Sequence, residues 1–118
     1  ANKVEGANFN QAKLGGARFG GLARCSLVDA QAADLYLGNG DCTPVDSDFT
    51  RADLSGSRFD GIYAGASKFI DANLSKARFG GGDLTGADFT NANLRGGALQ
   101  NTIADRVSFA GANLSCTD

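Results

Sequence analysis

The segment DFTRADLSGSRFDGIYAGASKFIDANLSKARFGGGDLTGADFTNANLRGGAL, residues 48–99, decides the fold of this chain. Every fifth residue in it is apolar, and the residue two positions earlier is usually small. A helix returns a side chain to one face every 3.6 residues and a strand every 2, so neither element alone buries this pattern. The five-residue unit must therefore turn a corner each time it recurs.

A longer period of twenty residues is superimposed on the period of five, which predicts four sides per coil. Coils stacked at the strand spacing of about 4.8 Å would place like residues on one another in the core. The expected core ladder holds Phe9, Phe49, Phe69, Phe89 and Phe109 in one series, Leu14, Leu54, Leu74, Leu94 and Leu114 in a second, and Phe19, Phe59 and Phe79, followed by Leu99, in a third.

The repeated unit resembles that of the pentapeptide-repeat proteins, whose motif is roughly A-(D/N)-L-x-x. It stands here as ADLSG at 52–56, ANLSK at 72–76, ADFTN at 87–91, ANLRG at 92–96 and ANLSC at 112–116. The resemblance covers roughly residues 4–19 and 47–116 and implies a right-handed β-helix. With the spacing, the expected fold is an all-β, right-handed, four-sided (quadrilateral) β-helix solenoid of about five to six coils. One domain, residues 1–118, is expected, with an irregular or inserted segment at about 20–48.

Two interpretations of residues 20–48 stay open, because the in-phase positions there become polar. In the first, the coil loses two residues near Gly20-Gly21, continues with Leu22, Leu27, Ala32, Leu37 and Cys42 as its inner set, and regains two residues before Phe49. In the second, residues 26–37 form a short helix on an extruded loop, capped by Ser26 and stopped by Gly38-Asn39-Gly40.

Both interpretations bring Cys25 near Cys42, and a disulfide between them is the favoured pairing, with two reduced core cysteines as the alternative. A disulfide would indicate an oxidising compartment, the thylakoid lumen or the periplasm, with the cytoplasm as the alternative. The chain has no Met, which predicts either a processed mature form or a fragment of a longer protein. These features resemble the photosynthetic branch of the family, found in cyanobacteria and in the chloroplast thylakoid lumen.

The residue types argue against catalysis, so the chain is not expected to be an enzyme or to hold a cofactor or metal. It contains no His, the usual acid–base group and metal ligand. The acids and Asn between residues 39 and 48 could bind Ca²⁺, but a solvated polar loop is the favoured interpretation. The net charge of −2 gives no reason to expect direct nucleic-acid binding, and no apolar run is long enough for membrane insertion.

Arg18, Arg58 and Arg78 each precede a phenylalanine of the third series, so they are expected to project from one wall as a short basic ladder. Asp60 lies close by and would temper its charge. The ladder could dock an acidic partner, and the three arginines are therefore the candidate partner-binding residues. The alternative is a solvated face that contributes little to stability.

The expected function is a structural or protein-interaction module whose partner is another protein. The open ends of a β-helix expose backbone and core, so end-to-end self-association or capping residues beyond the given sequence are also expected. The family resemblance implies an alternative, a DNA-mimic protein that binds DNA gyrase or another type II topoisomerase and protects it from quinolones. A third interpretation is a spacer domain of a longer protein.

Overall fold

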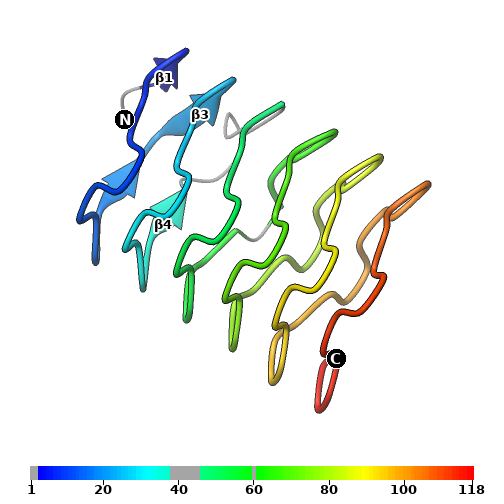
Figure 1. Ribbon diagram of the computed structural model, residues 1–118. Helices are drawn as coiled ribbons and strands as arrows, with labels where there is room; N and C mark the ends of the chain where they lie inside the picture. The colour runs from blue at the N-terminus through cyan, green and yellow to red at the C-terminus, as the bar shows by residue number, and fades with distance from the viewer. Residues whose placement is uncertain (1–2, 38–45, 60) are drawn as a thin grey trace.

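The computed structural model describes residues 3–37, 46–59 and 61–118, and this part of the chain contains short strands and no helix. β1 (Lys3–Glu5) pairs in parallel with β3 (Gly21–Ala23), and β2 (Arg18–Phe19) pairs in parallel with β4 (Tyr36–Leu37). Isolated parallel bridges continue the same pairing toward the C-terminus. The successive coils therefore lie side by side, with the two termini at opposite ends of the stack (Figure 1).

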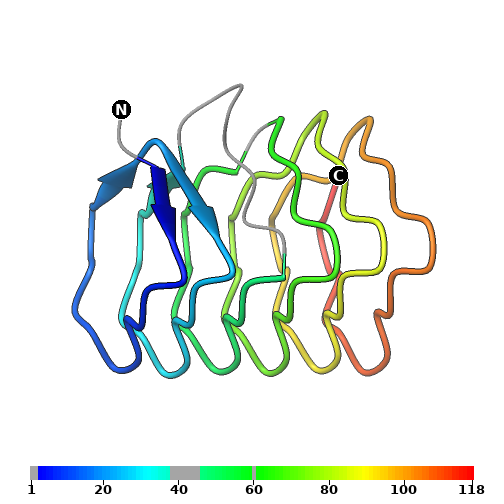
Figure 2. The same cartoon turned by 90° about the horizontal axis from the view of Figure 1, so that it is seen from above.

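Bridged residues form four columns that run along the stack, one on each side of the coil. This arrangement agrees with the four-sided coil that the twenty-residue period predicts, and successive coils follow nearly the same outline when seen from above (Figure 2). The first column holds Asn8, Ser26, Asp48, Lys68, Asp88 and Ser108, and the second column holds Lys13, Gln31, Asp53, Asn73, Asn93 and Asn113. The third column holds Arg18, Tyr36, Arg58, Arg78 and Ala98. The fourth column holds Lys3 and Gly21, and then Tyr63, Asp83 and Ile103.

The register confirms the continuous coil over the described part of residues 20–48. Asn8 pairs with Ser26, 18 residues on, Ser26 pairs with Asp48, 22 residues on, and later pairs are 20 apart. Two residues are thus lost near Gly20-Gly21 and regained before Asp48. The helix considered for residues 26–37 is wrong, because Ser26, Gln31 and Tyr36 pair in parallel on both sides.

Most corners of the described coils are β-turns whose third residue has a positive φ. The Phe49 carbonyl accepts a hydrogen bond from the amide of Ala52 at 3.0 Å, and Arg51 between them has a φ of 58°. This conformation costs a residue with a side chain about 1–2 kcal/mol. The Arg51 amide in turn donates to the Ile70 carbonyl of the next coil at 2.9 Å, so pairing between coils holds the corner in place.

Phenylalanine rings fill the middle of the coil in two adjacent ladders. Phe49, Phe69 and Phe89 stack face to face with centroids 4.8 and 4.7 Å apart, and Phe59 stacks on Phe79 at 4.9 Å. Rings of the two ladders meet edge to face at 5.7–6.4 Å. All five rings are fully buried. The edge-to-face contacts between the two ladders are among the arrangements that aromatic quadrupoles prefer.

Small inward residues let the walls approach, and three of them are serines. Ser47, Ser57 and Ser67 are buried, and each hydroxyl accepts a hydrogen bond from the amide at the equivalent position one coil earlier, at 3.1–3.2 Å. Gly82 takes this inward position beside Ile62 of the preceding coil, and a Cβ at Gly82 would lie 2.7 Å from the Ile62 carbonyl oxygen. The small residues of the repeat are therefore a packing requirement.

The core ladder thins toward both ends of the described coils. Phe9, Leu14 and Phe19 are only partly buried, as are Leu99 and Phe109. Leu114 is 42% exposed, so its expected place in the core is wrong: it shares the register of Leu94 but has a coil on one side only. The remaining ladder residues, Leu54, Leu74 and Leu94, are fully buried.

Candidate interaction surface

The three arginines of the expected basic ladder lie in one column of the fold. β2 brings Arg18 beside Tyr36 of β4, and bridges then join Tyr36 to Arg58 and Arg58 to Arg78. Each of these residues comes directly before a residue of the core ladder or of the inner set, so its own side chain projects outward. Arg18, Arg58 and Arg78 are exposed and Tyr36 is half-buried. We name these four residues the arginine column.

Tyr36 joins the arginines through a contact that the twenty-residue period does not reveal. The guanidinium carbon of Arg18 lies 4.4 Å from the centroid of the Tyr36 ring, a cation–π distance. Tyr36 lies 18 residues after Arg18 and 22 before Arg58, so it enters the column only once the two-residue shift in phase is located. The signal in the sequence is therefore the shift, rather than any motif around Tyr36.

Glycines border the arginine column along the chain. Arg18 lies between Gly16 and Gly20, each two residues away, and Gly80 follows Arg78 at the same distance. No side chain rises from these positions to cover the arginines. Asp60, which was expected to temper the ladder, lies outside the described residues.

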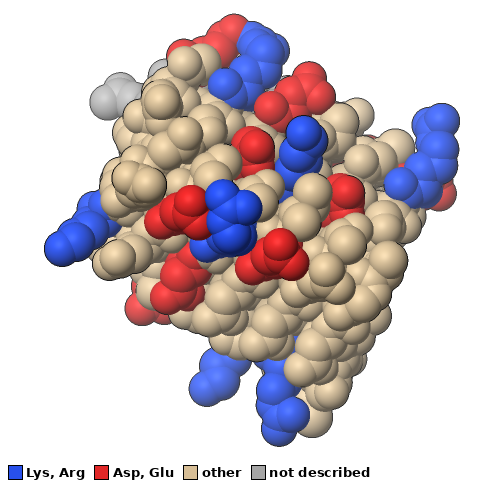
Figure 3. Space-filling view, in the orientation of Figure 1, with Lys and Arg blue, Asp and Glu red and all other residues tan. Residues whose placement is uncertain are grey.

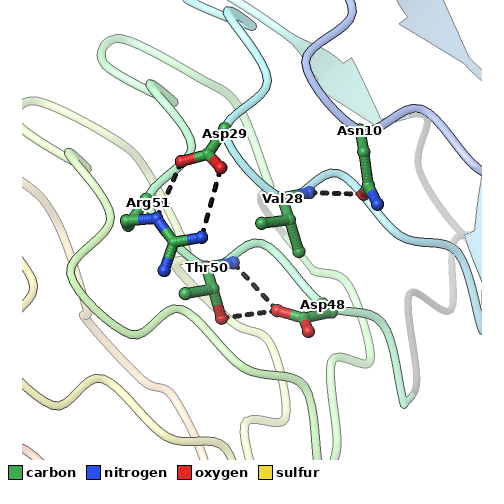
Figure 4. Close-up of polar contacts among 6 residues, drawn as sticks. All are labelled: Asn10, Val28, Asp29, Asp48, Thr50 and Arg51. Atoms are coloured by element: carbon green, nitrogen blue, oxygen red, sulfur yellow. Dashed lines mark hydrogen bonds and ion pairs between the residues drawn. The ribbon is translucent and has the colours of Figure 1, made fainter.

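The first column, on the opposite side of the coil, differs because its charges alternate in sign along the stack. Asp48, Lys68 and Asp88 follow one another from coil to coil. At the adjacent corner, the Arg51 guanidinium donates to both carboxylate oxygens of Asp29, at 2.8 and 3.1 Å (Figure 4). The face in Figure 3 accordingly intersperses acidic and basic side chains. The chain can thus balance charge between coils.

The Asp29–Arg51 pair also shifts the ionisation of both groups. The hydrogen bond and charge of Arg51 hold the pKa of Asp29 below its usual value, and Asp29 raises the pKa of Arg51. The Arg51 side chain is 54% exposed and that of Asp29 is 41% exposed, so the pair is a surface interaction of modest strength. A second ion pair joins Arg24 to Glu5 on another corner.

Outward aspartates of the repeat are engaged by the residue two positions later. Asp48 accepts hydrogen bonds from the amide and hydroxyl of Thr50, and Asp88 from those of Thr90. Asp83 makes the same contacts with Thr85, and these bonds lower its pKa. Asn10 reaches further and accepts from the Val28 amide of the next coil at 2.9 Å (Figure 4). These polar groups serve the strand-to-turn junctions.

The expected disulfide involves a residue that the structure does not describe. Cys25 is buried on the inner wall, where its amide donates to the Ser47 hydroxyl at 3.1 Å. Cys42 lies outside the described residues, as does most of the stretch weighed for Ca²⁺. Cys116 is exposed in the last coil. Elsewhere in the described ranges, no group of three or more His, Cys, Asp or Glu residues could hold a metal ion.

The repeat pattern matches a known family model, described as pentapeptide repeats, over residues 47–86 and 67–103. The chain belongs to the pentapeptide-repeat family. The family model carries 8 copies of the repeat, and its matched residues include the coils in which the phenylalanine ladders are fully buried. The pentapeptide repeat thus accounts for the five-residue period, the corner turns and the stacked core.

Solved structures of other pentapeptide-repeat proteins are similar to this chain. Rfr23 from the cyanobacterium Cyanothece 51142 is 22% identical, with 99% of this chain and 84% of that protein covered and a TM-score of 0.43. A pentapeptide-repeat protein from the Arabidopsis thaliana thylakoid lumen is 24% identical, and the match covers 99% of this chain and 64% of that protein with a TM-score of 0.36. QnrB1, a plasmid-mediated fluoroquinolone resistance protein, is 17% identical, with 98% and 83% covered and a TM-score of 0.37.

No curated protein sequence matches this pentapeptide-repeat chain. Within the described residues, no helix has the length and apolar character needed to cross a membrane.

Proposed function

We propose that this pentapeptide-repeat protein is a non-enzymatic structural or protein-interaction module whose partner is another protein. The observation that carries the proposal is the register, because parallel pairing arranges outward side chains in straight columns on a continuously packed core. A rigid wall of this kind meets a partner without paying much ordering entropy. Proteins of this family are generally non-enzymatic structural or interaction modules.

The polar groups of the chain support a role without catalysis, cofactor or metal. Asp48, Asp83 and Asp88 accept hydrogen bonds from their own neighbours, so these carboxylates already have a structural use. The sequence also supplies no His for acid–base chemistry. We therefore assign the outward columns to recognition.

Cross-linking of the natively isolated protein tests the interaction function. Lys13, Lys68 and Lys76 are exposed, so an amine-reactive cross-linker can report which protein lies against the rod. We expect residue-level cross-links to one other protein and a complex of fixed stoichiometry that re-forms from the two purified proteins. Cross-links confined to this chain, with a single-chain mass in native mass spectrometry, would contradict the proposal.

A DNA mimic that binds DNA gyrase or a related topoisomerase is the alternative function. A mimic of duplex DNA needs a strongly acidic surface, whereas this chain has a net charge of −2 and a column with three arginines. The interaction module is therefore the better supported function. Gyrase supercoiling with a quinolone present separates the two, since a DNA mimic should restore supercoiling and the proposed module should not.

We also propose an oxidising compartment, the thylakoid lumen or periplasm, with a disulfide between Cys25 and Cys42. The inner-wall position of Cys25 supports burial of a bond on the core side of the coil. Intact mass spectrometry with and without reductant and alkylation tests both points. A two-proton difference that maps to these two cysteines is expected, and three free thiols would favour the cytoplasmic alternative.

The finer architecture belongs to the same proposal: a single right-handed solenoid domain over residues 1–118, with about five to six coils. Partly exposed core residues in the last coil, such as Leu114 and Phe109, support end-to-end self-association. Sedimentation velocity over a hundredfold range of concentration tests it. Association should grow with concentration and weaken in the variant Leu114→Glu, whereas a constant single-chain mass would contradict it.

A further inference from the structure

We propose that this protein stacks head to tail: the last coil of one copy, residues 103–118, pairs in parallel and in register with the first coil of a second copy, residues 3–18. The inference rests on the end-to-end self-association proposed above and adds which ends meet and how they align. The first and last coils lie at opposite ends of the stack, so each has one face that no described coil covers (Figure 1).

The first argument is the complementary set of backbone groups on the two end faces. Within the stack, the Phe89 amide donates to the carbonyl of Ser108, one coil later, at 2.8 Å. In the last coil, the Phe109 amide and the Val107 carbonyl have no hydrogen-bond partner among the described residues. At the other end, the carbonyl and the amide of Asn8 likewise have none within the described ranges. Asn8 of a second copy would satisfy both groups of the last coil.

The next side of the coil repeats this complementarity and sets the direction of the stack. In the described structure, the Leu114 amide and the Ala112 carbonyl are free at one end, and the carbonyl and amide of Lys13 are free at the other. Every bridge within the protein is parallel, so the pairing continues only if both copies run the same way around the coil. A symmetric pair joined through two last coils would run its chains in opposite directions. The free groups therefore favour the head-to-tail stack.

The second argument is the incomplete core at both ends. Phe109 has a ring on one side only and Leu114 is 42% exposed, while Phe9 and Leu14 are only partly buried. In register, Phe109 would lie on Phe9 and Leu114 on Leu14, which is the like-on-like stacking of the middle coils. The junction would thus remove apolar surface of both ends from water, which favours association.

The third argument is the charge that meets across the junction. Asp118 follows Ala98 in the arginine column: its carbonyl accepts from the Leu99 amide at 2.6 Å, and its amide donates to the Gly97 carbonyl at 3.0 Å. A second copy would bring Arg18 directly opposite Asp118, and both residues are exposed in the single chain. Opposite charges that face each other on paired strands stabilise the pairing.

One like-charged contact also arises among the described residues, because Asp105 would come beside Glu5 of the second copy. Arg24 already forms an ion pair with Glu5, and Arg106 is the residue next to Asp105. These two arginines balance the contact. The charges of the two end coils are therefore compatible with the proposed register.

Disulfide trapping with the native Cys116 tests the register. In the junction, Cys116 lies one coil from Gly16, at the strand spacing of about 4.8 Å, and a disulfide spans Cα separations of about 4.4–6.8 Å. A Cβ at Gly16 would meet no atom within 4 Å, and its φ of 70° is close to the 57° of Cys116 itself. We expect Gly16→Cys to form reducible chains of two, three and more copies, because a head-to-tail contact does not close. Mass spectrometry should map the bond to Cys116 and the introduced cysteine.

The matched control is Gly81→Cys, which has a φ of 75° and open space around its Cβ but lies in a middle coil. It should form no such chains, and G16C/C116S should lose them. Dimers linked through Cys116 alone, with no longer chains from Gly16→Cys, would overturn the inference in favour of a tail-to-tail pair. Equal chain formation by Gly81→Cys would also overturn it, because random collision would then explain the bonds.

Charge reversal across the junction tests the same register without cysteine chemistry. In sedimentation velocity, D118R should weaken association about twofold to fivefold, and R18D/D118R should restore it. The control R95D/D118R has the same net charge as the wild type and should not restore association. Rescue by both double variants, or by neither, would overturn the inference. Thermal unfolding of all variants checks that the fold is retained.

Failure of this inference is distinguishable from failure of the proposed self-association. If association grows with concentration but neither the disulfide chains nor the charge rescue appear, self-association stands and the head-to-tail register is overturned. A constant single-chain mass at all concentrations would overturn both. A partner protein found by cross-linking would support the interaction module in either case.

Discussion

The middle and last coils carry phenylalanine and leucine at two equivalent core positions and differ in what covers these side chains. Phe69 has a ring 4.8 Å away on one side and 4.7 Å away on the other, whereas Phe109 stacks on Phe89 alone, at 5.4 Å. Leu74 is fully buried, while Leu114 is 42% exposed. Burial in this fold is therefore set by the neighbouring coils, because the five-residue motif alone covers only part of each core residue.

The largest expected difference between the two regions comes from truncating the rings. Phe69→Ala should cost about 3–5 kcal/mol of unfolding free energy, because it empties a closed site between two rings. Phe109→Ala should cost about 1–2 kcal/mol, since less surface is buried there. Urea denaturation of both variants measures the difference. Equal losses, or a loss below about 1 kcal/mol for Phe69→Ala, would contradict the stacked core.

Adding volume at the small inward position should separate the regions by a smaller amount. Ala72 is 1% exposed and Ala112 is half-buried at the equivalent place in a later coil. Ala72→Val should cost about 1–3 kcal/mol through overpacking, and Ala112→Val less than about 1 kcal/mol. The same denaturation series checks both values. An unchanged unfolding free energy in Ala72→Val would mean that the middle coils are loosely packed.

Substitution of outward-facing residues should change the unfolding free energy as little in the middle coils as in the last coil. Arg58→Glu should change the unfolding free energy by less than about 0.5 kcal/mol, because the side chain is exposed. Arg106→Glu in the last turns of the chain is the matched control. A large loss for Arg58→Glu alone would show that the arginine column is buried in an interface or in an ion network.

The smallest expected effect is a pH dependence from the Asp29–Arg51 pair. Arg51 lowers the pKa of Asp29 below its ordinary value of 3.8, so the contribution of the pair is complete above that value. It is lost as the pH falls through the lowered pKa of the folded state. A ¹³C NMR titration of the Asp29 carboxyl should show a higher midpoint in Arg51→Gln than in the wild type. Identical midpoints would mean that the pair does not persist in solution.

Much of the fold could be predicted from the sequence because each turn repeats one local solution. The five-residue spacing of Phe49, Leu54 and Phe59 gives the corners, and the twenty-residue spacing gives the four sides. The five-residue spacing returns to its original phase at Phe49, and this return correctly favoured a coil that continues through residues 20–37. The exposure of Leu114 could not be predicted, since its local motif is the same as that of the buried Leu94.

The surface was less accessible to sequence reasoning because its contacts join residues of different coils. Residues of the coil that contains Asp29 pair with residues 22 positions later, which places Arg51 beside Asp29. No sequence motif near Asp29 or Arg51 indicates that the two side chains are partners. The same offset inserts Tyr36 between Arg18 and Arg58. The hydrogen bonds of Asp48, Asp83 and Asp88 with Thr50, Thr85 and Thr90 also depend on turn geometry that the motif alone does not specify.

The central claim is that the coil continues through residues 20–37 and so aligns Tyr36 with Arg58 and Arg78 on one wall. A ¹⁵N- and ¹³C-resolved NOESY spectrum tests it directly, without any substitution. The account predicts contacts between backbone protons of Tyr36 and Arg58 and of Arg58 and Arg78, and none between Tyr36 and Gly56. Successive amide contacts across residues 26–37, as in a helix, with no contact from Tyr36 to Arg58, would contradict it.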